Sequence, residues 1–238
     1  MLPENRNQTV SNNLIFIILS RFVLHLKDND KCRVLRFATI FSNCGFMSLP
    51  LQQALLGADG VLFCATYIAT FNIIIWSYGT MLISGDKKFI TPKKLLLNPG
   101  LIAVAIGLVL FITQLPLPKI IEQPISYLAA LNTPLPMIII GFHLANSDFA
   151  KIIRDKAALY AIFLRLVAFP LVILAMLWAL GVDRVIATSI TISACAPVGA
   201  MSTMFTAKFK PHPQLIELSA GAVSLSTVLS LLTMPVII

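Results

Sequence analysis

Charged residues are scarce in this sequence. They make up 12% of its 238 residues, whereas hydrophobic residues make up 58%. Soluble domains carry roughly 25% charged residues, which cover a surface in contact with water. The composition therefore excludes a soluble fold of this length, and part of the surface must face lipid.

Cysteine and histidine are also few, and neither forms a metal or redox motif. The four cysteines include no C-x-x-C pair, and no histidine stands at metal-ligand spacing. We therefore expect free thiols, no metal and no cofactor. The sequence also has no H-E-x-x-H motif and no pair of aspartates deep in an apolar run. These absences count against an enzyme that acts within the membrane, which is one of the classes of function open to an apolar chain.

What the chain does have is long apolar runs, and a membrane-spanning helix needs about 20 apolar residues. Unpaired strand edges cannot be tolerated in lipid, so the runs predict an all-α integral membrane protein. The eight runs are residues 14–26, 35–56, 61–83, 100–112, 121–145, 157–180, 185–205 and 215–238.

The net charge of +8 is placed in the loops between the runs. Alternate loops hold thirteen basic residues against two in the other loops. Positive residues favour the cytoplasmic side, so the loops around residues 27–36, 87–94, 151–156 and 208–210 are predicted to be cytoplasmic. This distribution indicates a multi-pass protein of the cell membrane and gives no reason to expect a nucleic-acid partner.

Two runs carry helix-breaking residues near their middle. Residues 42–51 include Gly45 and Pro50, and residues 193–202 include Pro197 and Gly199. Proline removes a backbone donor, and glycine lowers helix persistence. Each interruption alone could be an ordinary kink. The loop charges, however, make the two runs antiparallel and five spans apart, which is the pattern of inverted-repeat transporters with a site at the bilayer midplane.

A repeat of five spans implies ten spans in total. If the interrupted runs are spans four and nine, the chain begins within span three, which suggests an N-terminally truncated protein. The short first run, broken by Arg21 and His25, agrees with this hypothesis. An inactive transporter remnant therefore stays open as an alternative to a working transporter.

Several stretches resemble the auxin efflux carrier family in its bacterial form. Their order and spacing together are more specific than any one of them, and they span roughly residues 30–238. They are N-C-G-F-M-S-L-P-L at 43–51, L-N-P at 97–99, N-T-P-L-P-M-I-I-I-G at 132–141, R-L-V-A-F-P-L at 165–171, A-C-A-P-V-G-A-M-S-T-M-F at 194–205 and the tail at 225–238.

The resemblance implies a ten-helix fold of two inverted repeats, with interrupted helices that cross. Residues 1–83 would then be the remainder of the first repeat (spans 3–5), 84–97 a cytoplasmic linker, and 98–238 the second repeat (spans 6–10). It also implies a secondary transporter of small organic anions such as malate-like carboxylates. The expected partners are that substrate and the lipid bilayer, and a homodimer is an open possibility.

The candidate substrate site lies at the two interruptions. We expect Asn43 and the backbone around Pro50 and Pro197 to line it, with support from Asn98 or Arg165. An amide donates hydrogen bonds to a carboxylate, and half-helix N-termini add positive potential. Arg165 has a second interpretation, because a charge near mid-membrane can also hold the backbone carbonyls of a broken helix.

Overall fold

The computed structural model describes residues 17, 18, 20, 24, 29–86, 99–113, 115–131, 134–145 and 149–238. All regular elements in these residues are helices, which confirms the all-α prediction. The first part of the chain holds α2 (Asn29–Ile40), η1 (Cys44–Ser48), α3 (Leu49–Ile74), η2 (Ile75–Gly79), α4 (Thr80–Ser84), α6 (Pro99–Thr113) and α7 (Lys119–Ala130). The second part holds α8 (Pro134–Ala145), α9 (Phe149–Arg154), α10 (Lys156–Phe163), η4 (Leu164–Ala168), α11 (Phe169–Ala179), α12 (Arg184–Cys195), α13 (Met201–Phe209) and α14 (Pro213–Ile237).

Three described helical stretches are long and apolar enough to cross a membrane. They are Cys44–Ser84, Lys156–Ala179 and Pro213–Ile237, and Arg184–Cys195 is a shorter apolar helix. The stretch Cys44–Ser84 has 41 residues, about twice the length of one span. It bends at Gly57, whose φ of 62° lies in the left-handed region that glycine adopts readily. This bend falls where the sequence predicted an outer loop between two spans.

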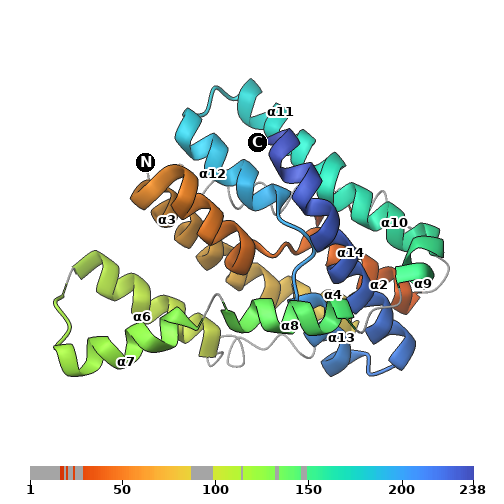
Figure 1. Ribbon diagram of the computed structural model, residues 1–238, viewed down its shortest axis with the longest axis horizontal. Coiled ribbons are helices and arrows are strands. Elements are labelled where there is room, and N and C mark those ends of the chain that lie inside the picture. Colours follow the sequence, from red (N-terminus) through yellow and green to blue (C-terminus); the bar gives the residue numbers. More distant parts are fainter. Residues whose placement is uncertain are drawn as a thin grey trace.

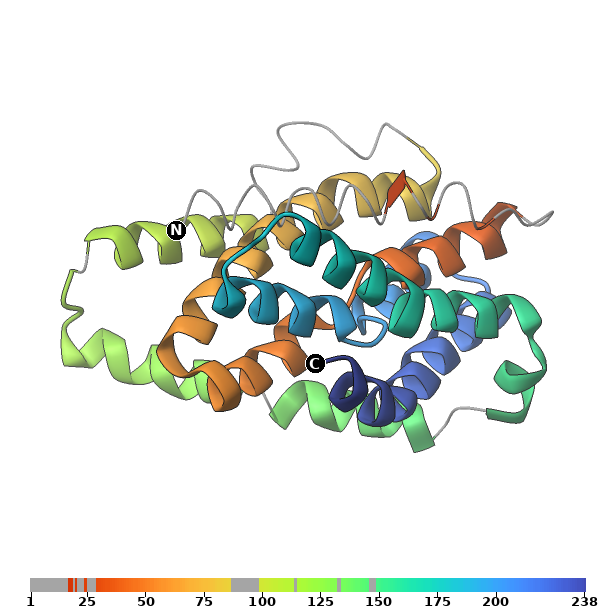
Figure 2. The ribbon, with the colours of Figure 1, turned by 90° about the horizontal axis from the view of Figure 1, so that it is seen from above.

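The predicted run at 121–145 is two helices. α7 ends at Ala130 and α8 begins at Pro134. α8 packs against α14, and α6 packs against α3. α6 and α7 extend beyond the rest of the molecule in both views, and none of the side chains of α7 is buried (Figure 1, Figure 2).

The core joins helices from both ends of the sequence. The main cluster of buried apolar residues includes Phe37 and Phe41 from the first part and Phe169, Ile190 and Phe205 from the second. α2 contacts α10 and α14, and α3 contacts α12. Among the described residues, helices from 1–83 and helices from 98–238 therefore share one core around the two interruptions, and the division into two repeats stays a prediction.

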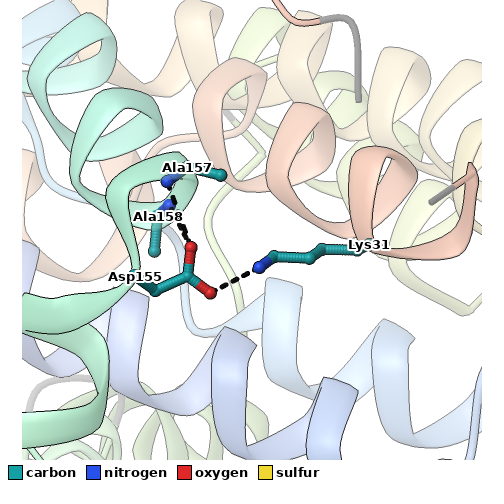
Figure 3. A network of polar contacts seen from close by, with 4 residues as sticks. All are labelled: Lys31, Asp155, Ala157 and Ala158. Atoms are coloured by element: carbon teal, nitrogen blue, oxygen red, sulfur yellow. Dashed lines mark hydrogen bonds and ion pairs between the residues drawn. The ribbon is translucent and has the colours of Figure 1, made fainter. Parts of the chain in front are cut away.

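Three of the predicted cytoplasmic loops meet at one end of the molecule. Lys31 Nζ lies 2.5 Å from Asp155 Oδ2, and Lys210 Nζ lies 2.9 Å from Asp30 Oδ1. Asp155 Oδ1 also accepts from the backbone N–H groups of Ala157 (3.1 Å) and Ala158 (3.2 Å), so the carboxylate caps α10 (Figure 3). These three basic loops therefore lie next to one another, as loops on the same side of a membrane would. The fourth basic loop, 87–94, lies outside the described residues.

The Asp155 carboxylate should make stability depend on pH. Partial burial raises its pKa, but the Lys31 hydrogen bond, the two N–H bonds and the Lys31 charge outweigh burial, so the pKa lies below its ordinary value of 3.8. A lowered pKa contributes stability above the unfolded value, and this contribution is lost as pH falls through the folded value. Asp155→Asn should therefore lower the melting temperature near neutral pH, by an amount that corresponds to about 1 kcal/mol or less.

The difference between wild type and Asp155→Asn should shrink as pH falls below about 4 and vanish in stronger acid. Melting curves across pH test this expectation. Glu217→Gln is the matched control, because Glu217 pairs with Lys151 at 2.8 Å through more exposed side chains. If wild type still melts above Asp155→Asn by the same margin in strong acid, the ionised Asp155 carboxylate is not the source of the difference.

Candidate functional site

The two interrupted helices cross at their unwound segments. The chain leaves α2 after Ile40 and leaves α12 after Cys195, and between these helices and the next ones the two segments pair through an antiparallel β-bridge of Ser42 with Val198. The two backbone hydrogen bonds run from the Asn43 N–H to the Pro197 carbonyl (2.8 Å) and from the Gly199 N–H to the Phe41 carbonyl (3.0 Å). Each segment thus satisfies backbone groups that the other break leaves free. The crossing predicted from the sequence is confirmed.

The breaks are shorter than predicted, and the two prolines play different parts. The sequence placed the first interruption at residues 42–51, but the unwound residues are 41–43 and a π-turn, η1, begins at Cys44. Pro50 lies at the start of α3, directly after that π-turn. A π-turn removes the need for the regular hydrogen bond that proline cannot donate. Pro197 lies within its break, and its carbonyl serves the crossing.

A cavity of about 260 Å³ opens at the crossing. Its walls come from residues within and directly after each break and from α3. The lining residues are Ser42, Asn43, Cys44, Gly45, Phe46, Leu49, Ile68, Phe71, Asn72, Gly199, Ala200 and Met201. None of these residues is charged, and most present apolar atoms. A few polar groups in an apolar wall are typical of a site for a small molecule.

Two polar side chains in this wall have a buried group without a hydrogen-bond partner among the described residues, the Ser42 hydroxyl and the Asn43 amide, and the amide of Asn43 carries the stronger donor for a carboxylate. Asn43 is 3% exposed, and its Nδ2 finds no hydrogen-bond partner among the described residues. Buried amide donors are nearly always paired in folded proteins, so an unpaired one calls for an explanation. A ligand in the cavity that accepts a hydrogen bond would supply the partner.

The helix ends give the crossing an electrostatic polarity. η1 and α13 begin at the cavity, with Cys44 and Met201 as their first residues. The first turn of a helix leaves N–H groups without helical partners and carries a partial positive charge. Two such ends meet at one cavity, so its surroundings favour a negatively charged group.

Arg165 lies at the opposite, carbonyl ends of the broken helices. It belongs to the π-turn η4, and its side chain is fully buried. It donates from Nε to the Ala196 carbonyl (3.1 Å) and from Nη2 to the Ala194 carbonyl (2.7 Å). It also donates from Nη1 to the carbonyls of Thr39 (3.3 Å) and Ile40 (3.2 Å). These contacts are those of the second interpretation, an arginine that holds the carbonyls of broken helices.

The five residues predicted for the site therefore have different places. Asn43 lines the cavity, whereas Pro50 and Pro197 flank it without lining it. Arg165 binds the carbonyl ends of both breaks and does not line the cavity. Asn98 lies outside the described residues. The role of each in substrate binding stays a prediction.

Sequence reasoning missed three residues at the crossing. Asn72 lines the cavity from α3, and a lone amide in the apolar run 61–83 was the signal that could have found it. Ser226 Oγ accepts from the Val198 N–H at 3.1 Å, so α14 also holds the second break. Gln52 was the third, and it lies in a buried polar network.

The Gln52 network joins α3 to α12. Its Nε2 donates to Ser48 Oγ (2.9 Å), Ser193 Oγ (2.8 Å) and the Ser189 carbonyl (3.2 Å), and its Oε1 accepts from Ser189 Oγ (2.5 Å). The Oγ atoms of Ser48 and Ser193 also bond each other at 3.1 Å. Gln52 is fully buried. The network fixes the helix after the first break against the helix before the second.

Comparison with known proteins now identifies the family. The family model described as "Membrane transport protein" matches residues 8–238, which is nearly the whole chain. A search of curated proteins found no match. The family is one of transporters, not of enzymes, so the intramembrane enzyme considered above is set aside. The chain belongs to the membrane transport protein family, that of the auxin efflux carriers.

Proposed function

We propose that this membrane transporter carries small organic anions across the cell membrane and binds them in the cavity at the helix crossing. The observation that supports the proposal best is the unpaired Nδ2 of Asn43 in a cavity where two helices begin. An N–H donor and two positive helix ends together stabilise an acceptor with negative charge. None of the described residues in the wall carries a carboxylate that would repel it.

The size of the cavity favours a small substrate. Its volume of about 260 Å³ lies below the roughly 300–1,000 Å³ typical of pockets for drug-sized ligands. Apolar side chains such as Leu49, Ile68 and Phe71 form much of the wall and suit the carbon skeleton of the substrate. A short mono- or dicarboxylate such as malate combines this size with the charge that the helix ends favour.

The proposal includes the predicted architecture of eight spans from two inverted repeats. The 41-residue stretch Cys44–Ser84 bends at Gly57 into two parts, which fits the end of one span and the next span. The reciprocal hydrogen bonds at the crossing are those expected of two related segments that meet across a twofold axis. The predicted boundary after residue 83 falls near the end of α4, and the predicted boundary before residue 98 lies outside the described residues.

Substitution of Asn43 tests the proposed site. Asn43→Ala should weaken malate binding about tenfold or more, because a hydrogen bond to a charged ligand is lost. Asn43→Asp should weaken it further, because a carboxylate of nearly the same shape repels the substrate. Binding is measured on purified protein, and malate counterflow is measured in proteoliposomes. The melting temperature of each variant shows whether the fold is kept.

Thr188→Ala is the matched control. Thr188 is half-buried on α12, its Oγ1 donates to the Arg184 carbonyl at 2.8 Å, and it does not line the cavity. Its loss should leave malate binding unchanged. If Asn43→Asp is folded and binds malate as well as wild type, Asn43 is not part of the site and the crossing is structural only.

A further inference from the structure

Arg165 is a buried charge whose surroundings are backbone carbonyls. Its guanidinium donates to four of them, on Thr39, Ile40, Ala194 and Ala196. Three of these residues are the last residues of α2 and α12 or lie within one position of those ends, and Ala196 is the first residue of the second break. The arginine thus contacts both broken helices at once, from a third one.

Such helix ends ordinarily attract cations. The last turn of a helix leaves carbonyls without helical partners and carries a partial negative charge. In inverted-repeat transporters, carbonyls at unwound segments and at the C-terminal ends of half-helices coordinate the Na⁺ that drives transport. The crossing of this chain presents two such ends close together, at the position that the Arg165 side chain fills.

We propose that the Arg165 guanidinium takes the place of a bound cation among the carbonyls of Thr39, Ile40, Ala194 and Ala196, which we call the carbonyl cage. Neither folding of the crossing nor substrate binding beside it then requires Na⁺. Folding independent of Na⁺ stands on the Arg165 contacts alone, and only the statement on substrate binding rests on the proposed function. An arginine is charged at every physiological pH, so the cage keeps its cation throughout the cycle.

The chemistry of arginine explains why this residue fits the cage. Its planar group presents five N–H donors in fixed directions and can serve carbonyls on two helices together. The ammonium of a lysine is a point charge with three donors and would serve fewer of the four carbonyls. The π-turn Leu164–Ala168 that carries Arg165 is continuous with α10 and α11, so the cation is fixed to a helix that belongs to neither break.

The test measures melting temperature in different cations, so it does not depend on any transported substrate. Wild type should melt at the same temperature in Na⁺, K⁺ and choline at equal ionic strength. Arg165→Ala should melt roughly 10 °C lower, because a cage of buried carbonyls has lost its cation. Free guanidinium at low millimolar concentration, far below denaturing levels, should raise the melting temperature of Arg165→Ala and leave wild type unchanged.

Two further variants complete the test. Arg184→Ala removes an exposed arginine beside the N-cap of α12, and it should melt as wild type does with no response to guanidinium. Arg165→Lys should melt between wild type and Arg165→Ala. If Arg165→Ala does not accumulate, the cation series on wild type and on Arg165→Lys decides the question.

Either of two results would overturn the proposal. One is a wild-type melting temperature that rises in Na⁺ but not in choline, which would show that the fold still takes an inorganic cation. The other is an Arg165→Ala variant that melts as wild type does or ignores guanidinium. Failure of malate to bind at Asn43 would leave these readings unchanged, so the two proposals can fail separately.

Discussion

Replacing Gln52 with leucine should destabilise the protein by about 3 kcal/mol. Gln52 is fully buried and bonds Ser48, Ser189 and Ser193 across the interface of α3 and α12. Leucine fills much of the same volume but offers no hydrogen bond. The Ser189 hydroxyl would lose the partner it has in the structure, and the Ser193 hydroxyl would lose one of its two. For a chain of this length the melting temperature should fall by roughly 10 °C.

Removing the Ser189 and Ser193 hydroxyls as well should recover part of the stability that Gln52→Leu loses. Exchanging both partners of a buried hydrogen bond for apolar groups costs much less than exchanging one. The triple variant Gln52→Leu, Ser189→Ala, Ser193→Ala should therefore melt above Gln52→Leu alone. Gln53→Leu is the matched control, because the neighbouring Gln53 is exposed and should tolerate the change. A Gln52→Leu protein that melts as Gln53→Leu does would show that the network contributes little.

The crossing could be predicted from the sequence because its signals are local. Proline, glycine and small polar residues at 42–51 and 193–202 mark the two breaks without knowledge of any partner. Loop charges then supplied the antiparallel direction of the two runs. The extent of the first break was predicted wrongly, because Pro50 follows a π-turn and lies in α3, whereas the chain unwinds at residues 41–43. A proline marks a helix disturbance but does not fix which turn absorbs it.

The polar partners at the crossing could not be predicted, because they are tertiary. The depth of Arg165 in its run was visible in the sequence, but its carbonyl partners lie 29 to 126 residues away along the chain. Gln52 and Ser189 are separated by 137 residues, and nothing in either local pattern points to the other. The Val198 N–H is likewise satisfied by a serine of α14. The helix-breaking residues showed that backbone groups at the two breaks needed hydrogen-bond partners. Only the fold shows which residues supply those partners.

A methyl group at Gly199 should disrupt the crossing itself. A Cβ built there would lie 2.9 Å from the Ser42 carbonyl oxygen, 3.2 Å from the Ser42 carbonyl carbon and 3.3 Å from the Phe41 carbonyl oxygen. These neighbours are backbone atoms of the opposite break, so no side chain can turn away to make room. Gly199→Ala must therefore separate the two segments and lengthen the hydrogen bond from the Gly199 N–H to Phe41. We expect a loss of about 1–3 kcal/mol of stability, typical of overpacking at a buried contact.

Under the proposed function, the same substitution should abolish malate binding at the cavity, because Gly199 and Ser42 both line it and would move apart. Gly45→Ala is the matched control: Gly45 lines the same cavity, but a Cβ there meets no atom within 4 Å. Gly45 lies in the π-turn η1, where alanine lowers the entropy of the unfolded chain, so this variant should melt at the wild-type temperature or slightly above it. Melting curves and malate titrations on both variants separate the two effects. If Gly199→Ala melts and binds as Gly45→Ala does, the close backbone contact at the crossing is not what shapes the cavity.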